Sequence, residues 1–111
     1  MFAKKSTSGY RSPVQGIELK TLVHGQKTLM AEFRLQAGSS LPVHSHPHEQ
    51  TGYLVQGRLR LQVGPESHEC GPGDSWCIPS EVEHGAEVLE DALAVEVFSP
   101  VREDYLPEAS Q

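Results

Sequence analysis

The sequence predicts a single all-β domain built from short antiparallel strands in a barrel or a sandwich. Three observations favour this class. The chain has 111 residues, which suffice for one compact domain but not for two. Its 10 Gly and 8 Pro residues fall at short intervals and leave little room for long helices. In several segments apolar and polar residues alternate with a period of two, as they do in strands with one buried face.

The first half of the chain contains two clear strand patterns. Residues 1–15 are polar and predict a loose N-terminal arm. Strands are expected at residues 17–23 and 29–35, separated by a turn at residues 24–27. Gly and Pro at residues 38–42 interrupt the pattern.

Further strands are expected in the second half, between turns rich in Gly and Pro. Gly57 is expected to stop one of them. Residues 86–98 contain no Gly or Pro, so a helix of about three turns is an alternative there. The β-branched residues near Val97 favour two strands joined at Glu90-Asp91 instead. The expected strands cover residues 51–56, 59–63, 76–78, 82–88 and 92–98.

Charge and composition exclude some functions. The net charge is −6 and no basic run is present, which argues against nucleic-acid binding. No stretch approaches the roughly 18 apolar residues of a membrane span, and the polar N-terminus lacks the apolar core of a signal peptide. Cys70 and Cys77 form no C-x-x-C motif and are expected to be ordinary reduced thiols. These features predict a cytoplasmic protein without a membrane or nucleic-acid partner.

Three histidines lie within five residues, at His44, His46 and His48. Side chains two apart in an extended strand share a face, so His44 and His46 would direct two imidazoles to one point. One or two further nitrogen or oxygen donors would complete a metal site. The H-x-H pattern alone fits a cluster of solvated surface histidines equally well.

The run from Gly38 to Gly57 resembles the first sequence motif of the cupin family. That motif has a Gly, five residues, H-x-H, three or four residues, an acidic ligand, six residues and a Gly. His44 and His46 stand at these spacings, and Gln50 occupies the acidic position.

A second cupin motif is half kept. Gly73, Pro79 and His84 stand at its spacings, whereas Glu81 replaces a Gly and Val88 replaces an Asn. Together the motifs imply a cupin fold, a double-stranded β-helix or jelly-roll barrel. We expect the barrel at residues 16–100, the arm at residues 1–15 and a C-terminal tail at residues 101–111.

The cupin resemblance implies one divalent metal ion. Nitrogen and oxygen ligands of this kind suit Ni, Zn, Fe, Mn or Cu. A neutral Gln in place of Glu leaves the site more positive by about one charge, which favours Lewis-acid chemistry over oxygen chemistry. An alternative is a barrel whose metal site has decayed, with Gln50 only hydrogen-bonding. The implied ligands are His44, His46, Gln50 and His84.

A closer resemblance is to small cupins of the KdgF type, carried by H-S-H-P-H-E-Q at residues 44–50 and E-V-F-S-P-V-R-E-D-Y-L at residues 96–106. Those enzymes act in pectin and alginate breakdown and open cyclic 4,5-unsaturated monouronates to keto acids. Their pocket is lined by an acidic residue, a Phe and an Arg, which correspond here to Glu96, Phe98 and Arg102. The resemblance implies that Glu96, in place of Asp, is the acid/base and that Arg102 holds the uronate carboxylate.

Other interpretations of these residues remain open. Phe98 also fits the core, and Arg102 fits a solvated tail or a dimer edge. His48 is expected either to orient a ligand or substrate in the pocket or to lie on its rim. The alternative functions are a metal-dependent dioxygenase of a small substrate and a non-catalytic sugar-binding or sensing module. The arm and Tyr105-Leu106 are candidates for contacts in a homodimer.

Overall fold

The structure, a computed structural model, describes residues 1–106 of the chain. The all-β prediction is confirmed, since this range holds eight strands and one short 3-10 helix. No helix in this part of the chain is long and apolar enough to cross a membrane. The elements are β1 (Arg11–Val14), β2 (Ile17–His24), β3 (Leu29–Leu35), β4 (Ser40–His44), β5 (Glu49–Val63), β6 (Glu66–Cys70), β7 (Ser75–Ile78), β8 (His84–Ser99) and η1 (Glu103–Tyr105).

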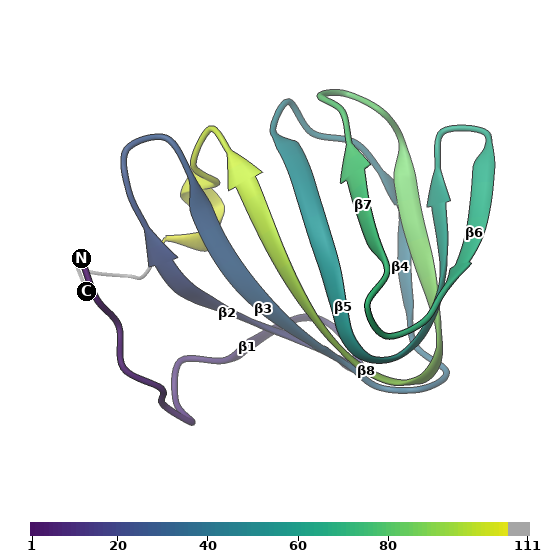
Figure 1. Cartoon of the computed structure of the whole chain (residues 1–111), viewed down its shortest axis with the longest axis horizontal. Helices are drawn as coiled ribbons and strands as arrows, with labels where there is room; N and C mark the ends of the chain where they lie inside the picture. The colour runs from purple at the N-terminus through teal and green to yellow at the C-terminus, as the bar shows by residue number, and fades with distance from the viewer. Residues whose placement is uncertain (107–111) are drawn as a thin grey trace.

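The two long strands β5 and β8 form the frame of the molecule. They pair antiparallel along their whole length, from Glu49 opposite Ser99 to Val63 opposite His84. β8 carries β4 along its first half and β3 along its second half. β5 carries β7 along its first half and β6 along its second half. Two layers result, β1-β2-β3-β8-β5-β7 and β4-β8-β5-β6, which share the long strands (Figure 1).

Both long strands bend between the two layers near Gly57. Gly57 has φ 94°, and a Cβ atom there would lie 2.3 Å from the carbonyl oxygen of Asp91 and 2.5 Å from Cα of Ala92. Only Gly fits such a close approach at a positive φ. β8 runs down one side of the barrel, turns and rises on the other side, so both of its ends lie at one mouth (Figure 1).

Several strand boundaries differ from the sequence predictions. Gly57 does not stop a strand, and Glu90-Asp91 does not join two, because the β5–β8 ladder continues through the bend. The helix alternative for residues 86–98 is therefore wrong. The interruption expected at residues 38–42 is largely strand β4, which tolerates Pro42 because, within residues 1–106, it pairs only with β8.

The expected arm and tail are partly structured as well. Arg11–Val14 of the arm forms edge strand β1 against β2. The tail folds over the barrel mouth, where the Tyr105 ring packs edge-on against Phe98 at a centroid distance of 5.3 Å. Tyr105 and Leu106 thus pack against the chain's own core. Residues 107–111 of the expected tail lie outside the described residues.

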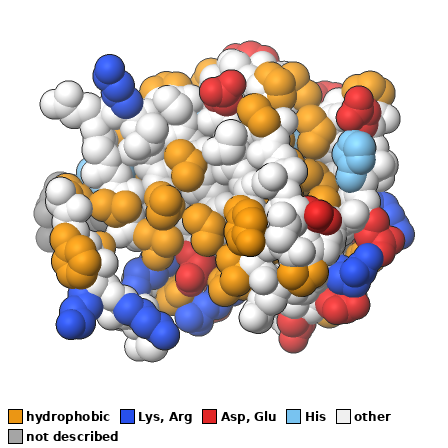
Figure 2. All heavy atoms as spheres, viewed as in Figure 1, with side chains coloured by type: hydrophobic (Ala, Val, Ile, Leu, Met, Phe, Trp, Pro, Cys, Tyr) orange, Lys and Arg blue, Asp and Glu red, His pale blue; other side chains and the backbone are white. Residues whose placement is uncertain are grey.

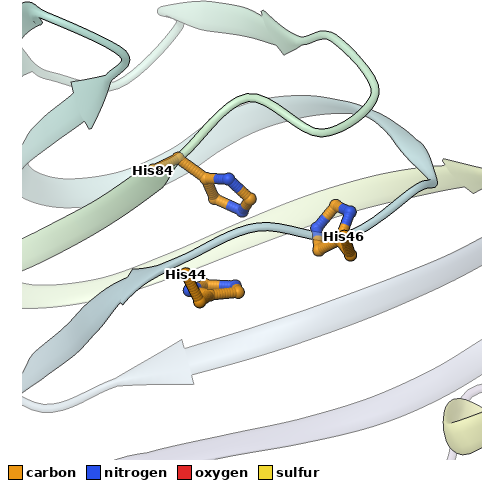
Figure 3. Close-up of side chains that lie close together, drawn as sticks. All are labelled: His44, His46 and His84. Atoms are coloured by element: carbon orange, nitrogen blue, oxygen red, sulfur yellow. The ribbon is translucent and has the colours of Figure 1, made fainter.

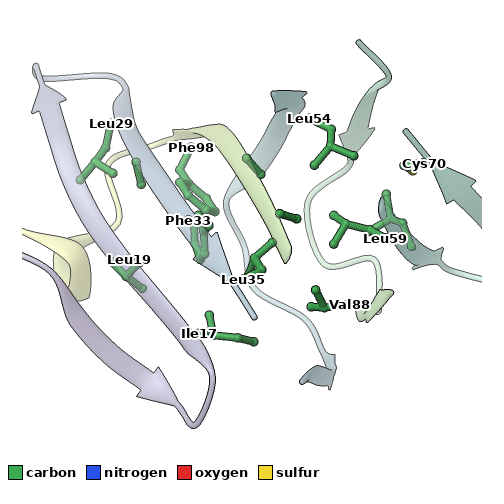
Figure 4. Packing of buried hydrophobic residues seen from close by; sticks show 14 residues of the cluster. Ile17, Leu19, Leu29, Phe33, Leu35, Leu54, Leu59, Cys70, Val88 and Phe98 are labelled. Atoms are coloured by element: carbon green, nitrogen blue, oxygen red, sulfur yellow. The ribbon is translucent and has the colours of Figure 1, made fainter. Parts of the chain in front are cut away.

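The hydrophobic core fills the space between the two layers (Figure 4). Its members are the inward positions of the period-two patterns, as the burial of alternate residues in β3 shows. The largest fully buried side chains are Phe98, Ile17, Leu19, Leu29, Leu54 and Ile78. Within residues 1–106, three of the four buried polar side chains line one cavity together with Arg102 and Tyr105 of the tail, which locates the candidate site.

Glu81, at the position of the second motif's missing Gly, generates the first testable prediction. Its φ of 67° is left-handed, a conformation that costs a non-Gly residue roughly 1 kcal/mol. We therefore expect Glu81→Gly to raise the free energy of unfolding in urea by about 0.5–1 kcal/mol, although most Gly substitutions destabilise. Glu83→Gly removes the same charge at an exposed residue outside the left-handed region, and it should lower stability. An equal decrease in the free energy of unfolding in both variants would contradict backbone strain at Glu81.

Candidate metal centre

Three imidazoles meet at the covered mouth. His44 ends β4 and pairs with His84, which begins β8. His46 follows on the segment that leads into β5 (Figure 3). One nitrogen of each ring lies within 4.8 Å of the others. The structure therefore brings together the three histidines that the sequence motifs predicted.

Hydrogen bonds to its backbone carbonyls hold the His46 segment in place. The Ser80 hydroxyl donates to the carbonyl of Pro47 at 2.7 Å. The backbone N–H of Glu81 donates to the carbonyl of His46 at 2.8 Å. Glu81, whose backbone is left-handed, thus contacts the His46 loop directly.

Each of the three imidazoles is anchored through Nδ1. Because a carbonyl oxygen only accepts, each Nδ1 carries a proton and each Nε2 keeps a lone pair for a metal. Burial also lowers the pKa of His46 and of His84, which favours their neutral, metal-binding forms. The accepting carbonyls are those of Pro42 for His44 at 2.8 Å, of His48 for His46 at 2.9 Å and of Val82 for His84 at 2.9 Å.

Gln50, the fourth predicted ligand, faces the same point from the start of β5. Its side chain is buried, and its Oε1 lies 3.0 Å from Nε2 of His46. Its Nε2 donates to Oε1 of Glu96 at 2.6 Å, which turns the carbonyl end of the amide toward His46. Two acceptors thus face each other in a buried site, an arrangement that a cation between them satisfies. The donor set therefore fits a divalent metal ion.

Glu96 is buried next to this ligand set. Its Oε1 also accepts a hydrogen bond from Nε1 of Trp76 at 3.0 Å. Burial raises the pKa of the Glu96 carboxyl to about 7, although the hydrogen bonds from Gln50 and Trp76 act in the opposite direction. Gly52 on β5 lies between Trp76 on β7 and Glu96 on β8. A Cβ atom on Gly52 would lie 2.2 Å from Nε1 of Trp76 and 2.6 Å from Oε1 of Glu96.

A cavity of about 50 Å³ lies beside these side chains, room for a few water molecules. Arg102, on the tail, reaches it from the mouth, with its guanidinium 4.1 Å from the Tyr105 ring centroid. Its Nε and Nη2 donate to the two carboxylate oxygens of Asp104 at 3.0 and 2.8 Å. The predicted site residues that line the cavity are His44, Gln50, His84, Glu96, Phe98 and Arg102.

His48 belongs neither to the group of three imidazoles nor to the cavity lining. Its carbonyl anchors His46, but within residues 1–106 its side chain is not among those that line the cavity. Its Nδ1 is buried and has no hydrogen-bond partner in the described part of the chain. A pocket role for the His48 imidazole therefore stays a prediction.

Trp76 and Gly52 were missed as site residues, although the sequence contains a signal for each. Trp76 lies two residues before Ile78, and Gly52 lies two residues after Gln50, so all four point to the same face of the sheet. A Gly at an inward position of a strand often marks a close approach by another group. The partners of these residues come from other strands, so only the register identifies them.

The Cupin domain family matches residues 31–100, and the chain belongs to this family. Its structure is similar to that of KdgF from Halomonas sp., with 30% identity, a TM-score of 0.89 and coverage of 96% of this chain and 100% of that chain. An RmlC-like cupin from Shewanella frigidimarina has 26% identity, a TM-score of 0.89 and 95% coverage of both chains. The DMSP lyase DddQ from Ruegeria pomeroyi, at 19% identity, a TM-score of 0.73 and coverage of 81% and 55%, shares the fold alone. No curated protein sequence matches the chain.

Replacing Glu96 by Gln should stabilise the metal-stripped protein at pH 8 but not at pH 5. The folded pKa of about 7 exceeds the ordinary 4.5, so the folded state binds more protons between these values and loses stability as the pH rises through this window. Above this pH window, ionisation of Glu96 lowers the free energy of unfolding of the wild type by about 3 kcal/mol, and Glu96→Gln does not have this loss. Urea unfolding in EDTA at both pH values measures the difference. A difference independent of pH would contradict the burial of an ionisable carboxyl at this position.

Proposed function

We propose that this cupin is an enzyme that holds one divalent metal ion on His44, His46, Gln50 and His84 and opens the ring of a 4,5-unsaturated uronate. The observation that carries the proposal is the buried Glu96 carboxyl in contact with Gln50, in a cavity that Arg102 also lines. The likeness to KdgF over nearly the whole chain supports the same activity. When bound, the metal ion supplies a Lewis acid that polarises a ring oxygen or hydroxyl of the sugar. Ni, Zn, Fe, Mn and Cu all suit this ligand set.

Glu96 is the proposed acid/base. Within residues 1–106, both side-chain hydrogen bonds to its carboxyl fall on Oε1, so Oε2 is the oxygen available to the substrate. A carboxyl with a pKa of about 7 exchanges a proton readily in either direction near neutral pH. Oε2 would give a proton to the ring oxygen as its bond to C1 breaks, and the carboxylate would take up the proton of the C1 hydroxyl, which leaves an aldehyde and an enol. Loss of the enol proton and protonation of C4 would then complete the keto acid.

Arg102 is the proposed carboxylate binder. Its ion-pair partner Asp104 is exposed, so water competes with Arg102 for that carboxylate. A uronate carboxylate would therefore replace Asp104 in the same two-point contact. Because the cavity is small, it would take the reacting end of the sugar, with the rest at the mouth beside the exposed His44.

NMR of cyclic unsaturated galacturonate tests the proposal, with the metal-loaded wild type expected to speed the loss of the cyclic form. Glu96→Gln should lower kcat by about 10²- to 10⁴-fold, since it removes the proton-transfer group. Arg102→Lys should raise KM, because an ammonium lacks the planar fork that binds a carboxylate at two points. Glu103→Gln, at an exposed neighbour, is the control and should retain activity.

The outcome of that assay also separates the alternatives. No acceleration by the metal-loaded wild type would end the ring-opening proposal. Oxygen uptake with a small substrate would support a dioxygenase. Thermal stabilisation by the sugar acid without turnover would support a binding or sensing module.

We also propose a homodimer that pairs the outer face of β3, β8 and β5. Met30 opposes Val97 in the sheet, and Val95 opposes Tyr53, so their outward side chains form one apolar patch with Val55. Met30, Tyr53 and Val55 are exposed in the single chain. Hydrophobic side chains also gather along the middle of the face shown in Figure 2. Such a patch typically marks a protein contact.

Light scattering tests the dimer. The wild type at micromolar concentration should have about twice the 12.2 kDa mass of the chain. Tyr53→Lys places a charge in the apolar patch and should give a monomer. Glu66→Lys introduces the same residue on β6, away from the patch, with a larger charge change of +2 rather than +1, and should remain dimeric. A monomeric wild type would contradict this assembly.

A further inference from the structure

We propose that Glu96 is a positioning residue for the metal ligand Gln50, which it orients and to which it supplies negative charge through the amide. The inference rests on the metal site of the proposed function but not on its substrate. Three contacts carry it, namely those between Gln50 and Glu96, between Gln50 and His46, and between Trp76 and Glu96.

The first part of the argument is orientation. A Gln amide has a donating end and an accepting end, and rotation by half a turn exchanges them. If the donating end pointed at His46, it would bond the lone pair on Nε2, and the two groups would satisfy each other without a metal. Glu96 prevents this, because its carboxylate only accepts and lies 2.6 Å from Gln50 Nε2. It thereby holds Oε1 of Gln50 toward His46, in the metal-binding orientation.

The second part of the argument is charge. Three neutral imidazoles and an amide bring no negative charge to a divalent ion, unlike a ligand set with a Glu. Glu96 places a carboxylate one hydrogen bond behind the amide, in a buried site where electrostatic effects are strong. A charge-assisted hydrogen bond to the amide N–H makes the opposite oxygen more electron-rich and a better ligand.

Trp76 and Gly52 hold Glu96 in this position. They lie in one row across the sheet, from β7 through β5 to β8. Because Gly52 has no side chain, the Trp76 indole and the Glu96 carboxyl meet above it, where Nε1 donates at 3.0 Å. The row thus adds a fourth strand, β7, to the β4, β5 and β8 strands of the candidate site, and Trp76 acts on Gln50 only through Glu96.

Metal affinity tests the inference without any substrate. The wild type and variants are titrated with Zn²⁺ against a chromophoric chelator, and the Co²⁺ absorption spectrum reports on the ligand set. Glu96→Gln keeps an acceptor but loses the charge and should weaken Zn²⁺ binding about 10-fold, whereas Glu96→Ala loses both and should approach about 100-fold. Trp76→Phe should give a smaller loss. Tyr53→Phe, on the outer face of β5, should leave affinity and spectrum unchanged.

A double-mutant cycle distinguishes action through Gln50 from a general effect on the fold. In a Gln50→Ala background, Glu96→Gln should cause no further loss of affinity, because the residue through which it acts is gone. The exchange variant Gln50→Glu with Glu96→Gln moves the charge onto the ligand. It should bind Zn²⁺ at least as tightly as the wild type while losing turnover.

The results separate this inference from the proposed reaction. Wild-type affinity in Glu96→Gln and Glu96→Ala, or full additivity in the cycle, would overturn the positioning role while leaving the metal site in place. The expected affinity series in a protein without turnover would support the positioning role and count against ring opening. A wild type that binds neither Zn²⁺ nor Co²⁺ would remove both.

Discussion

Pairing of β5 with β8 on both sides of the bend at Gly57 is the constraint on which the site depends. Because the two strands stay paired beyond the register shifts between Leu54 and Leu59, each long strand passes from one layer to the other and returns to the same mouth. His84 at the beginning of β8 and Glu96 near its end therefore face one cavity, although twelve positions separate them along the chain. The contact of Gly57 with the backbone of Asp91 and Ala92 permits the strands to bend this closely.

At this mouth the interior contains more hydrogen-bond acceptors than donors. Three carbonyls orient the histidines so that lone pairs face inward, and Glu96 turns a further acceptor, Oε1 of Gln50, toward them. A cluster of inward acceptors is unfavourable in a buried site unless a cation occupies its centre. The same contacts that position these side chains thus weaken the metal-free state, so binding of a metal ion there would also stabilise the fold.

Local pattern was sufficient to predict two of the strands and to select side chains that meet at one point. Alternation predicted β2 and β3 within one residue, and motif spacing located His44, His46, Gln50 and His84. Prediction from local pattern failed where one residue type is compatible with two structures, since Gly57 suits a strand end and a strand bend equally well. It also failed for contacts between strands, because the approach of Trp76 to Glu96 depends on the register of three strands.

The pairing of Gln50 with Glu96 also explains how one site would serve both metal binding and proton transfer. A carboxylate that coordinates a divalent ion is held deprotonated by that ion and makes a poor acid near neutral pH. When an amide occupies the coordination position, the carboxylate stands one hydrogen bond away, where it still supports the ligand through Oε1. Oε2 then stays available to exchange a proton with a substrate. In the proposed enzyme, the Gln that departs from the usual acidic ligand is therefore the change that keeps the acid/base off the metal.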